Sequence, residues 1–148
     1  MSHTTTINAI EIKDVRAMEK AVADLQAKGV NCNLIKDAVP RMYYNNQVGK
    51  CDYVLKLNDS KYDVGFQKQK DGTFVPVLDE WGNHISDQIG GQCSIPTTRE
   101  EKALWAIGSF SQSYAKHAAI HAAEQQGYMV ESANTDADGN VNLVLTGM

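Results

Sequence analysis

Two stretches of the chain repeat apolar residues at the spacing of an α-helix. The first begins at Asp14, which is a predicted N-cap, and its apolar residues at spacings of three and four share one helix face: Val15, Met18, Val22 and Leu25. Gly29 is expected to end this helix in the left-handed conformation. This pattern predicts an amphipathic helix that packs on a core.

The second helical stretch opens with a capping-box pattern, Thr98-x-x-Glu101. Residues then recur at spacings of three and four: Leu104, Ile107, Ser111, Tyr114, Ala118 and His121. The pattern predicts either one helix that reaches Gln126 or two helices joined near Gly108. Gly127 is expected to close it.

Segments rich in β-branched and aromatic residues predict strands. Three of them follow one another, at residues 51–57, 62–68 and 73–78, and the joints Asn58-Asp59-Ser60 and Lys70-Asp71-Gly72 have the composition of tight turns. These three predict an antiparallel meander. Further strands are predicted at residues 5–13, 30–35, 128–132 and 141–145.

The order of these elements predicts a single α+β domain over residues 1–148. We expect a mostly antiparallel sheet with two helices packed on one face, ferredoxin-like with extra strands. Residues 83–98 contain Gly90, Gly91 and Pro96 and show no period, so they predict a loop insertion. The other face of the sheet would remain open to solvent or to a partner.

Composition and charge exclude several classes of protein. The 148 residues carry a formal net charge of −4, which argues against a surface that neutralises nucleic-acid phosphates. No apolar run is long enough to span a membrane, and the first residues lack the pattern of a signal peptide, so we expect a cytoplasmic protein. Cys32, Cys51 and Cys93 form no C-x-x-C pair, which favours a reducing compartment and buried thiols.

His117 and His121 are the strongest metal candidates. They are four residues apart on the predicted helix, with Glu124 three further on. The acid of an H-E-x-x-H motif is absent, so the alternative is a pair of histidines that hydrogen-bond to the backbone or to Tyr114. The carboxylates and amides of residues 136–142 resemble a calcium loop, but the glycine is misplaced and a hairpin turn is favoured.

Other motifs of chemistry are missing or ambiguous. The chain has no P-loop, no dinucleotide-binding pattern and no nucleophile elbow. Asp79 and Glu80 beside Trp81 form either a poised proton donor or, as we expect, a strand end with exposed charges. We expect no catalytic residue and no cofactor, and the candidate binding residues are aromatic: Tyr43, Tyr44, Phe66, Trp81 and Trp105.

Several motifs, in order along most of the chain, resemble one known family. They are the opening Met-Ser-His, Tyr62-Asp63-Val64-Gly65-Phe66, Asp71-Gly72-Thr73-Phe74, Trp81-Gly82, Tyr114-Ala115-Lys116-His117, Ala123-Glu124-Gln125-Gln126-Gly127-Tyr128 and Asp138-Gly139-x-x-x-Leu143-Val144-Leu145. The chain is similar to the hypothetical chloroplast reading frame thirty-five family, a family of unknown function in plastids, cyanobacteria and some tailed phages. That resemblance implies an accessory or adaptor role, with an AAA-type ATPase as a partner.

We therefore expect a non-enzymatic accessory protein that binds a protein partner through an exposed sheet face and the central loop. If the gene is carried by a phage, the partner belongs to the host cytoplasm. The alternative is a small-ligand or metal-binding domain, conceivably an enzyme, that uses His117, His121 and nearby carboxylates.

Overall fold

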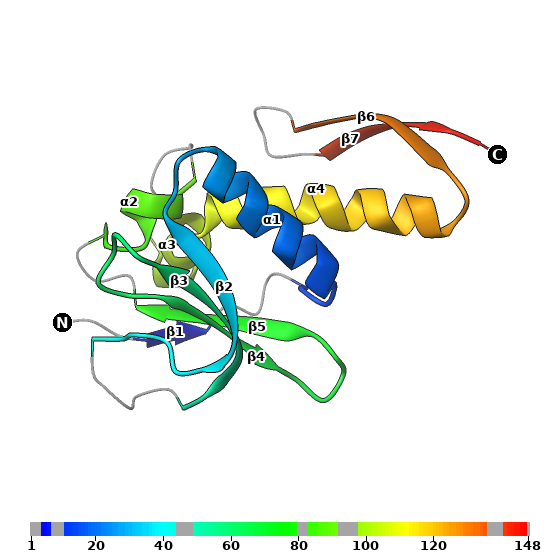
Figure 1. The fold of residues 1–148 in the computed structure, drawn as a ribbon. Helices are drawn as coiled ribbons and strands as arrows, with labels where there is room; N and C mark the ends of the chain where they lie inside the picture. Colours follow the sequence, from blue (N-terminus) through cyan, green and yellow to red (C-terminus); the bar gives the residue numbers. More distant parts are fainter. Residues whose placement is uncertain are drawn as a thin grey trace.

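A five-stranded antiparallel sheet forms the base of the molecule (Figure 1). The computed structural model describes residues 4–6, 11–43, 49–79, 83–91, 98–135 and 141–147. The strands are β1 (Thr4–Thr6), β2 (Cys32–Ala38), β3 (Cys51–Leu57), β4 (Val64–Lys68) and β5 (Phe74–Asp79). Their order is β1-β5-β4-β3-β2, so the predicted meander over β3, β4 and β5 is confirmed.

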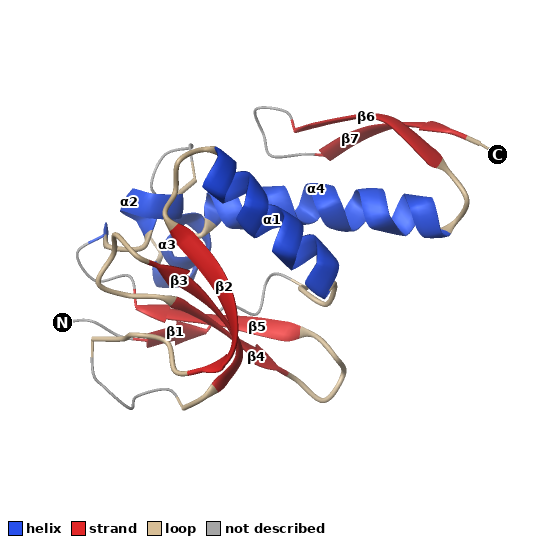
Figure 2. Ribbon diagram, in the orientation of Figure 1, coloured by secondary structure: helices blue, strands red, loops and turns tan. Residues whose placement is uncertain are grey.

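The four helices lie together on one face of this sheet (Figure 2). They are α1 (Val15–Ala27), α2 (Ser86–Ile89), α3 (Arg99–Ala106) and α4 (Gly108–Gln125). The side chain of Asp14 accepts a hydrogen bond from the backbone amide of Ala17. The side chain of Thr98 accepts one from the backbone amide of Glu101, so both predicted N-caps are confirmed. The second helical stretch is two helices, which break at Ile107.

One hydrophobic core joins the helices to the sheet. Its fully buried large side chains come from the helices and from alternate positions on the strands: Met18, Leu25, Leu55, Leu57, Phe66, Leu78, Ile85, Ile89, Ile107 and Phe110. Burial of each such side chain stabilises the fold by about 1.5–3 kcal/mol. The α+β class and the mostly antiparallel sheet are therefore confirmed.

The last two strands form a separate sheet. They are β6 (Met129–Thr135) and β7 (Val141–Thr146), which pair only with each other among the described strands. This hairpin lies against α4 on the side away from the large sheet (Figure 1). A ferredoxin-like arrangement would place the last strand in the large sheet. β7 pairs with β6 instead, so the strand order does not show the ferredoxin-like part of the prediction.

The segment predicted as a loop insertion contributes to the core. Within residues 83–91 the chain forms α2, and Ile85 and Ile89 are 0% and 1% exposed. Four residues are too few to show a helical period in sequence, which explains why the helix was missed. None of the helices in the described part of the chain is long and apolar enough to cross a membrane.

Candidate functional site

The face of the sheet opposite the helices is partly covered by the chain itself. Val54, Gly65 and Val77 lie in one row across β3, β4 and β5 on this face, and the two valines are 1% and 2% exposed. Residues 39–43, which we call the strap, cross over this row. Pro40 lies so close that a Cβ on Gly65 would be 3.0 Å from its Cγ. The expected open sheet face is therefore wrong for the centre of the sheet.

An ion pair between the half-exposed Arg41 side chain and the buried Asp63 carboxylate holds the strap in place. The Asp63 carboxylate accepts hydrogen bonds from Arg41 Nε at 3.0 Å and from Arg41 Nη2 at 2.8 Å. It also accepts the backbone amides of Arg41 and Leu57 at 2.9 and 3.1 Å. The hydrogen bond to Asp63 raises the pKa of Arg41, so the guanidinium stays charged.

The three predicted aromatic binding residues that the structure describes do not gather at one place. Phe66 is 0% exposed and its ring lies 5.3 Å from that of Phe110, so it belongs to the core and offers no surface to a partner. Tyr43 is 47% exposed at the end of the strap, and Trp105 is half-buried on α3. Tyr44 and Trp81 lie outside the described residues. The sequence did not separate buried aromatic residues from exposed ones because both fit a strand or helix equally well.

Asp79 is buried, although we expected an exposed charge at a strand end. Its Oδ2 accepts the amide of Tyr43 at 2.7 Å, and the residue is 0% exposed. Its other oxygen has no hydrogen-bond partner among the described residues. Burial, with a smaller contribution from the charge of Asp79, raises the pKa of Tyr62. The strap covers the end of β5, which the sequence pattern of β5 did not reveal. Glu80 lies outside the described residues.

The two histidines bind carboxylates at the N-cap of α1 and within α1. His121 Nδ1 lies 2.6 Å from Asp14 Oδ2, and His117 Nε2 lies 2.7 Å from Asp24 Oδ2. Because a carboxylate only accepts, each imidazole donates its N–H to the aspartate. Ser113 also donates to Asp24 at 2.7 Å. These two pairs, which we call the α1–α4 clamp, connect residues about a hundred positions apart in sequence.

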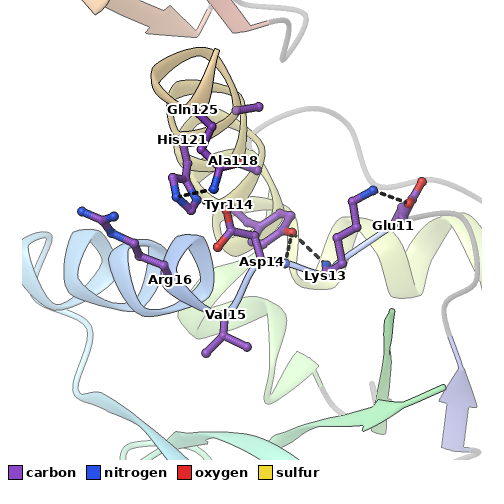
Figure 3. A pocket seen from close by; sticks show the side chains of 10 residues that line it. Glu11, Lys13, Asp14, Val15, Arg16, Tyr114, Ala118, His121 and Gln125 are labelled. Atoms are coloured by element: carbon purple, nitrogen blue, oxygen red, sulfur yellow. Dashed lines mark hydrogen bonds and ion pairs between the residues drawn. The ribbon is translucent and has the colours of Figure 1, made fainter. Parts of the chain in front are cut away.

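An open hollow of about 650 Å³ lies beside the first of these pairs (Figure 3). His121 reaches from α4 toward Asp14, while Arg16 and Lys13 lie on either side of Asp14 in this view. The Tyr114 hydroxyl accepts the backbone amides of Lys13 and Asp14, both at 3.0 Å, and so anchors the start of α1 to α4.

The clamp is suited to hold two helices together. Gln125 donates to His121 Nε2 at 3.3 Å, so both ring nitrogens have partners. The described residues that line the hollow include no serine or cysteine nucleophile. Glu124 is exposed, and the described residues contain no group of three histidine, cysteine, aspartate or glutamate side chains placed for a metal ion.

We expect the clamp to make the protein sensitive to acid. Partial burial raises the pKa of Asp14 and of Asp24, but hydrogen bonds outweigh it, from His121 for Asp14 and from Ser113 and His117 for Asp24, so both pKa values are lowered from 3.8. The unfolded chain therefore binds protons at higher pH than the folded chain, and stability rises with pH across this range. We expect the contribution of the clamp to the free energy of unfolding to be complete above about pH 5 and to be lost as the pH falls toward about 2.

Urea unfolding between these pH values checks this prediction. The double variant Asp14→Asn, Asp24→Asn is expected to have lower stability at neutral pH and a flatter pH dependence. Asp59→Asn, in an exposed turn, is the matched control. Equal slopes for the double variant and the native chain would contradict the role of the clamp.

Within the part of the chain that the structure describes, the C-terminal hairpin presents the largest group of exposed apolar side chains. Among the described residues seven large hydrophobic side chains are exposed, and four of them belong to the hairpin or to the residue before it: Tyr128 at 42%, Met129 at 59%, Val144 at 52% and Leu145 at 41%. The sequence predicted strands at residues 128–132 and 141–145, but not which side of each faces water.

The free edge of β7 adds a second feature. β7 carries no charged residue, while β6 carries Glu131 and a register shift between Val130 and Ser132. Bulges and charges discourage further strands from pairing, so β7 is the more receptive edge.

The comparisons with known proteins give a family and no activity. No curated protein and no solved structure matches the chain. A family model described as a protein of unknown function (DUF1257) matches residues 21–144. This range contains α4, the clamp histidines and most of the hairpin. The chain therefore belongs to the DUF1257 family of proteins of unknown function.

Proposed function

We propose that this protein is a non-enzymatic accessory protein that binds a partner protein through its C-terminal hairpin. The observation that carries the proposal is the exposed apolar surface of β6 and β7, with Met129 and Val144 more than half exposed. Exposed apolar patches on soluble domains commonly mark contact surfaces.

The shape of the hairpin supports the same proposal. A two-stranded sheet is marginally stable alone, and this one packs one side on α4. Val144 is 52% exposed, whereas its neighbour Leu143 is half-buried, so the outward side of the hairpin remains available. A partner that adds a strand to β7 would satisfy its edge amides and carbonyls and cover this apolar side.

The resemblance to the chloroplast reading frame family bears on which partner to test first. It suggests an AAA-type ATPase, and a contact in the cytoplasm, which is the host's cytoplasm if the gene is carried by a phage. The partner would bind the hairpin and not the large sheet, where we first expected the contact, because the strap covers the centre of that sheet.

Val144→Asp is the variant that tests the hairpin. We expect it to reduce partner capture by about tenfold or more, because an aspartate in an apolar contact must be desolvated. The tagged chain would be crosslinked in the cells that express it, and the bound proteins quantified by mass spectrometry. Ile35→Asp, an equivalent change at a side chain 37% exposed on β2, is the matched control and should not alter capture.

Equal capture by the native chain and by Val144→Asp would contradict the proposal. Loss of capture in Ile35→Asp alone would instead return the contact to the large sheet. Circular dichroism of each variant establishes that it is folded before capture is compared.

A further inference from the structure

The sulfur-containing side chains of the described residues differ widely in their exposure to solvent. Four of the five are nearly fully buried, between 0% and 6% exposed: Met18, Cys32, Met42 and Cys51. The fifth, Met129, is 59% exposed. Cys93 and the methionines at the two ends of the chain lie outside the described residues. Within the described part of the chain, Met129 is therefore the sulfur-containing side chain that an oxidant in solution can reach.

The two described cysteines are protected by their ionisation as well as by their burial. Burial raises the pKa of the Cys32 thiol and of the Cys51 thiol, so both stay protonated at neutral pH. Oxidants attack the thiolate, and a buried neutral thiol is inert. A thioether has no proton to lose, so the oxidation of a methionine depends on access to its sulfur and not on pH.

Met129 lies at the start of β6, in the surface that we propose binds a partner. It pairs with Thr146 of β7. Tyr128 before it and Leu145 beside Thr146 are also more than 40% exposed. A methionine side chain is flexible and apolar, so it adapts to the shape of a partner. Its conversion to a sulfoxide would place a polar group in this apolar surface.

We propose that Met129 is a site of reversible oxidation that releases the partner protein from the hairpin. The oxidant is a peroxide such as hydrogen peroxide. The thioether sulfur attacks one peroxide oxygen, the O–O bond breaks, and the other oxygen leaves as water with both protons. The sulfur loses two electrons and becomes a sulfoxide, while the peroxide is reduced. Methionine sulfoxide reductases reverse the step, with a thiol as the source of the two electrons.

The effect on binding follows from the polarity of the sulfoxide. In the free chain its oxygen accepts hydrogen bonds from water. A partner that covers Met129 would remove this water, so we expect oxidation to weaken binding by about tenfold unless the partner supplies a donor. The selectivity for Met129 rests on its exposure, and only the release of a partner rests on the proposed function.

The first experiment measures the modification without a partner. The purified chain is treated with hydrogen peroxide under native conditions, and the gain of one oxygen at each methionine is followed by peptide mass spectrometry. We expect Met129 to be oxidised at least about tenfold faster than Met18 and Met42, because burial shields their sulfurs. In concentrated urea the three rates should become similar. Equal rates in the folded chain would overturn the inference.

The second experiment compares partner capture by each chain before and after treatment with peroxide. Dithiothreitol is added after the peroxide, because it reduces cysteine sulfenic acids and disulfides and leaves the sulfoxide in place. The native chain should lose capture by about tenfold, and methionine sulfoxide reductases should restore it. Met129→Leu has no sulfur at this position, so its capture after treatment should equal its own value before treatment. Met42→Leu, the same change at a buried methionine, should lose capture as the native chain does.

Unchanged capture by the oxidised native chain, or an equal loss in Met129→Leu, would overturn the inference. An oxidised chain that is unfolded by circular dichroism would also overturn it, because release would then follow from the loss of structure.

Val144→Asp tests the hairpin separately. Capture that depends on Val144 and not on oxidation rejects this inference alone. Release by oxidation at Met129, with capture independent of Val144, rejects the contact proposed at β7 and retains this inference. If no protein is captured, the proposed function and the release both fail, and the oxidation rates still decide whether Met129 is the modified site.

Discussion

Replacement of Asp63 by alanine is expected to lower the free energy of unfolding by about 3 kcal/mol, because a buried carboxylate with four hydrogen bonds is lost. The Asp63 side chain is 3% exposed and accepts four hydrogen bonds, three of them from Arg41. Alanine leaves the Arg41 guanidinium with the Leu57 carbonyl, at 2.7 Å, as its remaining described partner, and leaves the buried amide of Leu57 without an acceptor. Urea unfolding at neutral pH measures the loss.

Release of the strap gives this prediction a second measurement. Cys51 is 1% exposed, and its Sγ lies in the same crowded region as Pro40, since both would contact a Cβ on Gly65. We expect the Cys51 thiol to react faster with a thiol reagent in Asp63→Ala, as mapped by mass spectrometry.

The matched control for Asp63 is Asp52→Ala. Asp52 is an exposed aspartate whose carboxylate accepts one amide, that of Lys68, at 2.7 Å. Its removal should cost about 1 kcal/mol. Similar losses for the two variants would show that the ion pair does not hold the strap.

Phe66→Ala is expected to cost about 3–5 kcal/mol, because it removes a whole ring from a closed core. Phe66 is 0% exposed and packs beside Phe110. The loss would appear as a lower urea midpoint with an unchanged slope.

Tyr43→Ala is the control for Phe66, since its side chain is 47% exposed. It should change stability by about 1 kcal/mol or less. If Phe66→Ala were as mild as Tyr43→Ala, the placement of Phe66 in the core would be wrong. Both residues were candidate binding residues in the sequence, and the comparison distinguishes the buried one from the exposed one.

Helix caps, helix ends and tight turns could be predicted from the sequence because interactions between residues a few positions apart determine them. The N-caps Asp14 and Thr98 satisfy amides three residues away, and the turn residues Gly29 and Gly127 have φ of 97° and 90°, as a left-handed helix end requires. The meander followed for the same reason, since turns of a few residues join its strands. α2 escaped prediction because four residues show no period.

The candidate site was less accessible to prediction. The helix face shared by His117 and His121 was readable from their spacing, but their partners Asp14 and Asp24 lie 107 and 93 residues away in sequence. Spacing within a helix says nothing about which helix packs beside it. Only the packing of α1 on α4 shows that each histidine pairs with an aspartate.

The sequence by itself determined most of the helices, strands and turns, the α+β class that they build, and the modest negative charge of the chain. These properties depend on hydrophobic period, backbone preferences and capping, all of which act within a few residues. Only the tertiary structure decided that the strap covers the large sheet, that Phe66 and Asp79 are buried, and that the last hairpin packs on α4 with an apolar side exposed. These depend on how distant surfaces fit together, because a residue in a strand has the same local pattern whether its side of the sheet meets water or another part of the chain.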